Sequence, residues 1–137
     1  MKKLFHCSVA LLLVISLFCA FSVTPMALSD KQVSESRNGT STVGNLTYIY
    51  GATTTASTTF ASASASCNRN IRLTATIVAT LSIKGDNVDE NVATDIIMGT
   101  SAYASVTNVK DRTSYDISKA TGRFTIGSLA DYTIVIT

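Results

Sequence analysis

Residues that could carry acid–base or nucleophilic chemistry are scarce in this chain. The single histidine, His6, stands in an apolar N-terminal segment, together with two of the three cysteines, Cys7 and Cys19. Without that segment, no histidine remains to activate a serine or cysteine nucleophile. One cysteine without a histidine also cannot build the usual zinc site. We therefore expect a protein that is not an enzyme and that holds no cofactor.

Acidic side chains gather in one polar stretch, residues 84–95. Asp86, Asp89 and Glu90 stand among asparagines there and supply the oxygen ligands that calcium prefers, so they are the candidate metal ligands. Their spacing does not follow a regular calcium-binding loop, and the alternative is a solvated hairpin tip. A carboxylate pair for glycoside hydrolysis would also need a cleft, which so small a domain rarely offers.

Three tyrosines are candidate contacts for a ligand or partner. Tyr48 and Tyr50 lie in the first expected strand, and Tyr103 stands between Ser101 and Ser105 on a face that we expect to be exposed. Exposed tyrosines can stack on sugars or anchor a protein partner, although the absence of tryptophan argues against sugars. The alternative is that they are ordinary surface or core-edge residues.

The remaining cysteine, Cys67, ends a row of alternating alanines, Ala61, Ala63 and Ala65. Because this row should face the core, we expect Cys67 to be a small buried hydrophobic residue. An intermolecular disulfide and a reactive thiol are the alternatives.

The clearest structural pattern is residues 70–83. Its odd positions are all apolar, whereas Val78 is the only apolar residue at the even positions, which is typical of a strand with one buried face. The alanine row before it fits the same register if residues 68–70 form a three-residue hairpin loop with an asparagine in the left-handed conformation. Cys67 would then lie opposite Ile71, and Ala65 opposite Leu73. This predicts a long hairpin over residues 55–83.

The other elements follow from weaker alternation. Residues 46–50 predict a strand, residues 84–91 a polar loop, and residues 96–107 a strand whose even positions face the core. Turns are expected at 108–114 and 120–122, with short strands beside them and a last strand at 132–137. Nearly a third of residues 30–137 are Ser or Thr, which favours strands. We predict a small all-β protein, an antiparallel β-sandwich of about six or seven strands forming a single domain over residues 45–137.

The N-terminus predicts export. Lys2 and Lys3 precede an apolar run at residues 10–21, which is shorter than the roughly 20 residues that a membrane span needs. We expect a signal peptide with a signal helix over residues 1–29, cleaved after Ser29; an uncleaved anchor is the alternative. Residues 30–44 have no periodicity and are expected to form a mobile polar arm.

The net charge and the predicted export limit the classes of partner that we expect. All nine acidic residues follow residue 29, and without Lys2 and Lys3 the eleven basic residues become nine, so the chain after cleavage is near neutral. We expect no nucleic-acid partner and no membrane association after cleavage. The leading hypothesis is a secreted, extracellular, non-enzymatic protein that binds a protein or cell-surface partner, with self-association as an option. The alternatives are a structural subunit of an extracellular fibre or coat and a small bacteriocin-like effector.

Overall fold

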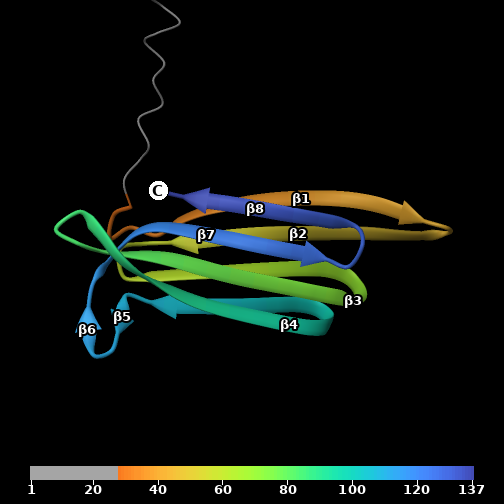
Figure 1. Ribbon diagram of the computed structural model, residues 1–137. Coiled ribbons are helices and arrows are strands. Elements are labelled where there is room, and N and C mark those ends of the chain that lie inside the picture. Colours follow the sequence, from red (N-terminus) through yellow and green to blue (C-terminus); the bar gives the residue numbers. More distant parts are fainter. Residues whose placement is uncertain (1–27) are drawn as a thin grey trace, which may run out of the picture.

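The computed structural model describes residues 28–137, so nearly all of the predicted signal peptide and its helix lie outside the described residues. The strands are β1 (Val33–Val43), β2 (Leu46–Ala56), β3 (Phe60–Ile83), β4 (Asp86–Thr107), β5 (Val109–Lys110), β6 (Thr113–Ser114), β7 (Asp116–Ile126) and β8 (Ala130–Ile136) (Figure 1). All pairings are antiparallel, which confirms the predicted fold class. Across residues 28–137 no helix is long and apolar enough to span a bilayer.

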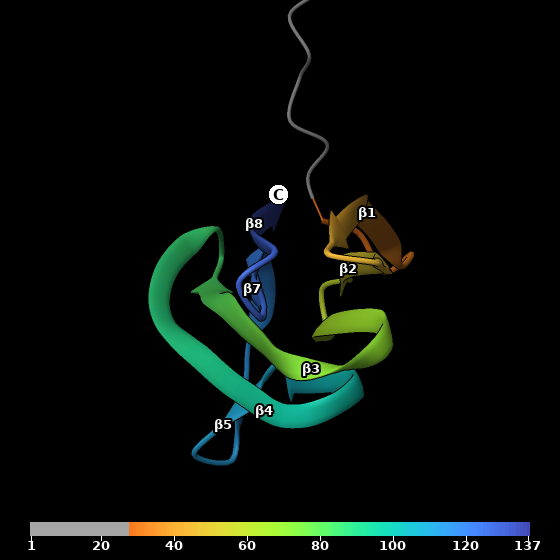
Figure 2. The ribbon, with the colours of Figure 1, turned by 90° about the vertical axis from the view of Figure 1, so that its right-hand side faces the viewer.

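Two unusually long strands, β3 and β4, belong to both layers of the fold. Each bends sharply near its middle, and the chain direction reverses there (Figure 1). The first arm of β3 pairs with β2, the second arm pairs with β7, and β4 accompanies β3 along both arms. One layer is therefore β1-β2-β3-β4 and the other is β8-β7-β3-β4, and the bent ribbon of β3 and β4 joins them (Figure 2).

The bend in β3 corrects the predicted hairpin. The chain reverses near residues 68–70 as expected, but the two arms do not pair with each other. Ala65 pairs with Ala52 of β2 and Ala102 of β4, and the alanine row packs face to face with the second arm across the core. The bend also lacks the expected left-handed asparagine, since the non-glycine residues with positive φ in the described chain are Lys84, Asp111 and Arg112.

The core confirms the apolar rows of β3 except at the end of the second row, where Ile83 is 45% exposed and Ser82 is buried after the register shifts beside Leu81. Leu73, Ala75, Ile77, Ala79 and Leu81 are fully buried, and Ala61, Ala63 and Ala65 are buried opposite them. Small side chains in one layer thus face large ones in the other, and this lets the two layers approach closely.

The expected core face of residues 96–107 is only half right. Ala102, Ala104 and Val106 are buried, but Ile96 and Met98 are exposed. The cause is the register shift between β3 and β4 at the bend, between Ser66 and Ile71 of β3. Because side chains alternate between faces, the shift changes which residues face inward. Odd-numbered residues of β4 face inward before the bend, and even-numbered residues face inward after it.

The predicted mobile arm at residues 30–44 is wrong, because β1 occupies most of it. All eleven residues of β1 pair with β2. Hydroxyl pairs strengthen this edge: the oxygens of Ser34 and Thr55 lie 2.8 Å apart, as do those of Ser36 and Thr53. A strand held by main-chain bonds and hydroxyls needs no apolar alternation, so the sequence carries no sign of it.

Two predicted connections are strand instead. The loop expected at 84–91 is a tight turn at Lys84 and Gly85, and β4 begins directly after it. The turn expected at 120–122 lies inside β7. Gly122 stands there because β2 approaches closely: a Cβ on this residue would lie 2.0 Å from Oγ1 of Thr54 and 2.8 Å from the ring of Phe124.

The outer strands β1 and β8 lie side by side without a hydrogen-bonded ladder, so the sheet is nearly closed and barrel-like (Figure 1). Tyr132 of β8 packs toward Gly39 of β1, and its ring centre is 6.5 Å from that of Tyr50. Burial, followed by the neighbouring Tyr50 hydroxyl, raises the pKa of Tyr132 above its ordinary value.

Candidate interaction surface

The β1–β2 hairpin extends past the rest of the sheet at one end of the molecule (Figure 1). The ladder between β2 and β3 ends at the pair Tyr50 and Cys67, so residues 46–49 pair only with β1. A two-residue turn, Gly44-Asn45, closes the hairpin, and Gly44 adopts the left-handed conformation with φ of 62°. We call residues 43–49 the hairpin tip.

Side chains from the bend of β3 brace the hairpin tip where the ladder stops. The Asn68 Oδ1 accepts a hydrogen bond of 2.9 Å from the main-chain N–H of Ile49, and its Nδ2 donates to the carbonyl of Thr47. The Arg69 Nε donates to the same Thr47 carbonyl at 3.0 Å. The Arg69 guanidinium also lies 5.9 Å from the ring centre of Tyr48, within the range of a cation–π interaction. These contacts continue the ladder with side chains and hold the tip in place.

The braced tip presents aliphatic side chains to solvent. Val43 is 56% exposed, Leu46 44% and Ile49 57%. Hairpin turns usually carry polar residues, so three exposed aliphatics beside one turn are unusual. Because the tip is already ordered, a partner that covers it would gain apolar burial with little loss of chain entropy.

The three candidate tyrosines lie in different surroundings. Tyr48 is part of the hairpin tip and is half-buried under Arg69. Tyr50 belongs to the core, with its hydroxyl 3.0 Å from that of Ser41, so the prediction that it contacts a partner is wrong. Tyr103 is exposed as expected, on a serine-rich outer face of β4, away from the other two.

The structure does not bring the three candidate calcium ligands together. Asp86 pairs with Ile83 at the start of β4, and Asp89 and Glu90 are consecutive strand residues whose side chains point to opposite faces. Within residues 28–137 no three acidic, histidine or cysteine side chains form a metal-binding group. The candidate ligands are separated because residues near in sequence are drawn out along a strand.

Asp89 has a different role in the fold. Its Oδ1 lies 2.7 Å from the Nζ of Lys110, and the carboxylate also accepts the N–H of Glu90. The hydrogen bond from Lys110 lowers the pKa of Asp89, and the same bond raises the pKa of Lys110. Both groups are exposed, so the pair joins the β5–β6 ribbon to β4 without adding much stability.

Cys67 is a free thiol and is buried, as expected. It pairs with Tyr50 at the end of the β2–β3 ladder, and its Sγ lies 3.8 Å from Oδ1 of Asn68. An intermolecular disulfide at this position would require the sheet to open.

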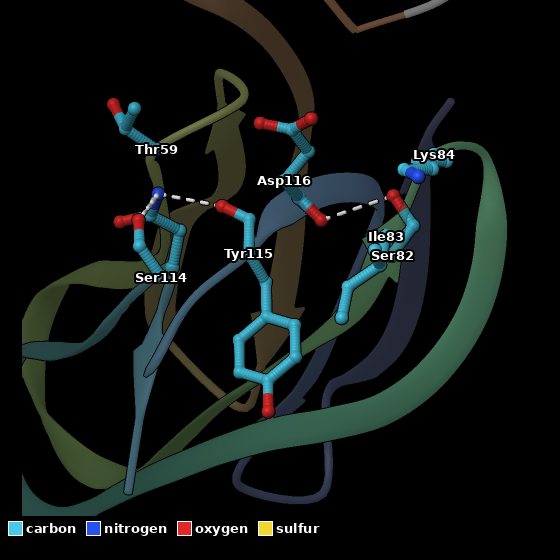
Figure 3. A pocket seen from close by; sticks show the side chains of 8 residues that line it. Thr59, Ser82, Ile83, Lys84, Ser114, Tyr115 and Asp116 are labelled. Atoms are coloured by element: carbon cyan, nitrogen blue, oxygen red, sulfur yellow. Dashed lines mark hydrogen bonds between the residues drawn. The ribbon is translucent and has the colours of Figure 1, made fainter. Parts of the chain in front are cut away.

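A shallow hollow of about 370 Å³ lies between the β3–β4 turn and the segment after β6 (Figure 3), at the end of the molecule opposite the hairpin tip (Figure 1). Its polar groups already serve the fold: Asn108 Nδ2 donates to the carbonyl of Tyr115 at 2.7 Å, and Ser82 Oγ donates to that of Asp116 at 3.2 Å. These bonds tie neighbouring segments together, so these polar groups are already used within the fold. The hairpin tip is therefore the stronger candidate for an interaction surface.

Sequence reasoning missed the hairpin tip, although part of the signal is present. Gly-Asn between apolar residues, as in Val43-Gly44-Asn45-Leu46, is a known two-residue hairpin signal. The bracing role of Asn68 and Arg69 has no such local signal, because their partners lie about twenty residues away. Comparisons with known protein families, curated proteins and solved structures found no match.

Proposed function

We propose that this is a secreted, non-enzymatic protein that binds a cell-surface protein through the hairpin tip. The carrying observation is a rigid protrusion that ends in exposed aliphatic side chains, with Val43 and Leu46 on one face of the hairpin and Ile49 on the other. Fully burying one aliphatic side chain contributes roughly 1.5–3 kcal/mol, so three half-exposed ones supply on the order of 1 kcal/mol each. The partner should present an apolar pocket, with an acidic group near Arg69.

The predicted signal peptide supports the proposed extracellular location, and the near-neutral chain that follows it favours apolar over electrostatic recognition. The perturbed groups Asp89, Lys110 and Tyr132 are each explained by pairing or packing in the fold, so they do not point to a catalytic site.

The test measures binding of the fluorescently labelled protein to producing cells and to cells cultured beside them. We expect Leu46→Ser combined with Ile49→Ser to weaken binding at least tenfold with an unchanged circular dichroism spectrum. Val135→Ser removes a comparably exposed aliphatic from β8 and serves as the matched control, with binding as in the wild type. Equal binding by the tip variant and the control would refute the role of the tip.

The effector and fibre alternatives predict different results. A bacteriocin-like effector inhibits the growth of neighbouring cells at low concentration, whereas the binding role alone does not. A fibre subunit forms filaments visible by electron microscopy. The fold gives the fibre little support. Within residues 28–137 the free edges of β1 and β8 face each other, and side chains of β4 cap its own second arm at Tyr103 and Thr107, so a fibre would have to grow from the first arm of β4 alone.

A further inference from the structure

The outer edge of β4 is protected along one arm and open along the other. The bend of β4 places its two arms in facing layers, and polar side chains of the first arm reach the edge of the second. Asp95 Oδ2 accepts a hydrogen bond of 2.9 Å from the main-chain N–H of Tyr103. Asn91 Nδ2 donates to the carbonyl of Thr107 at 3.0 Å. The edge of the second arm is therefore capped at Tyr103 and Thr107 from within the same strand.

The first arm has a free run from Val92 to Met98. Lys110 Nζ donates to the carbonyl of Glu90 at 3.0 Å, which shows that the main-chain groups of Glu90 point away from β3. In an antiparallel ladder this orientation repeats every second residue, and the register is unbroken from Glu90 to Met98. Val92, Thr94, Ile96 and Met98 therefore direct their N–H and C=O groups outward. Among residues 28–137, no side chain bonds to these groups.

The side chains of this run are unusually apolar for an open edge. Val92 is 56% exposed, Ile96 57% and Met98 71%, and all three lie on the outer face of β4. Edge strands that stay monomeric commonly carry lysine, proline, a bulge or an inward-pointing charge. Residues 92–98 contain no lysine, proline or bulge, and their one charge, Asp95, points inward and is held by the N–H of Tyr103.

We propose that the first arm of β4 pairs with the same arm of a second copy of this chain, antiparallel, with the two-fold axis at Thr94. The inference does not depend on the proposed binding role of the hairpin tip. It joins the layers β8-β7-β3-β4 of two copies into one continuous sheet.

The sequence of the arm is self-complementary in this register. Val92 of each copy lies opposite Ile96 of the other, which gives two equivalent apolar pairs, and Thr94 lies opposite Thr94 of the second copy. Apolar residues therefore meet apolar ones on both sides of the axis. Asp95 lies opposite Ala93, and no carboxylate faces another. A shift of the axis to residue 95 would place Asp95 opposite itself, which like charges disfavour. A shift to residue 96 would place Val92 opposite Thr100, beyond the bend at Gly99.

The assembly should stop at two copies. A two-fold pairing uses the same edge on both chains and leaves no second open edge to extend it. The caps from Asp95 and Asn91 keep the other arm of β4 from pairing, so the proposed dimer is closed.

Two measurements test the proposal on the purified protein. Sedimentation equilibrium should show a dimer, and Thr94→Lys should raise its dissociation constant at least tenfold, because two ammonium groups would meet at the axis. Thr133→Lys places the same charge on the outer face of β8 and should leave the dimer intact. Separately, Thr94→Cys should form an interchain disulfide on mild oxidation, because directly opposed residues have Cα atoms about 5.5 Å apart.

Thr76→Cys is the matched control for cross-linking. Thr76 pairs with Thr94 on the same face, with the two hydroxyls 3.0 Å apart, but lies one strand further from the axis. It should not cross-link. A monomer at all concentrations, a dimer insensitive to Thr94→Lys, or equal cross-linking through both cysteines would each overturn the proposal, whatever the outcome of the cell-binding test.

Discussion

The close approach of β2 and β7 makes Gly122 the most informative position for a stability test. A Cβ at this position would lie 2.0 Å from Oγ1 of Thr54, a distance that real Cβ atoms do not adopt. Thr54 is fully buried and has a short, branched side chain, so it cannot swing aside as the end of a lysine could. Gly122→Ala therefore forces the two layers apart or drives Thr54 from its rotamer.

The expected cost combines two opposing terms. Overpacking a close-packed core costs about 1–3 kcal/mol. Replacing glycine with alanine at a compatible backbone returns about 0.4–1 kcal/mol by restricting the unfolded chain. We expect a net loss of roughly 1–2 kcal/mol in the free energy of unfolding, which for a domain of this size lowers the melting temperature by about 4–16 °C.

Urea unfolding monitored by circular dichroism measures this cost, with Gly99→Ala as the control. Gly99 is also a strand glycine, but the nearest atoms to its added Cβ are those of Ile97 at 3.5 Å, an ordinary contact. We expect Gly99→Ala to be close to neutral. In a Thr54→Ala background Gly122→Ala should cost less than in the wild type, because the nearer obstruction is gone while the Phe124 ring, 2.8 Å from the added Cβ, remains. Equal stability of Gly122→Ala and the wild type would refute the described packing of β2 on β7.

Three further perturbations test the described contacts. Because the pKa of Tyr132 is raised in the folded protein, its neutral phenol contributes stability that is fully present below about pH 10 and is lost as the pH rises through the folded pKa. The urea midpoint of the wild type should therefore fall above about pH 10, and that of Tyr132→Phe should fall less steeply. Ala63→Asp should cost several kcal/mol or prevent folding, whereas Ser64→Asp on the outer face should cost less than about 1 kcal/mol; unchanged thermal stability of the first would show that the alanine row does not line the core. Asn68→Ala should speed amide hydrogen exchange at Ile49 by about tenfold, and an unchanged rate would show that Asn68 does not brace the tip.

The rows of β3 could be predicted from the sequence because alternation is set by the strand itself. The strand that lies beside each row could not be predicted in this way. Ala65 faces the core whether it lies beside Leu73 in one sheet or across from it in another layer, so the apolar pattern is the same in both cases. The choice depends on competition from β2 and β7 for the same edges, which is a tertiary effect.

The candidate surface shows the same division between local and distant signals. The Gly44-Asn45 turn and its aliphatic neighbours are a local pattern that could have identified the hairpin tip. The acidic group at 86–90 suggested a metal site because a loop would have gathered it, whereas a strand spreads it over two faces. The brace from Asn68 depends on a bend that only the folded chain creates.

The passage of β3 through both layers has a consequence for how the protein opens. A sandwich built from two separate sheets can loosen one sheet while the other persists. Here the same 24-residue strand supplies hydrogen bonds to β2 in one layer and to β7 in the other. Sub-global unfolding of either layer would strip one arm of β3 and expose the core of both. The amides of the two layers should therefore exchange together, as one cooperative unit.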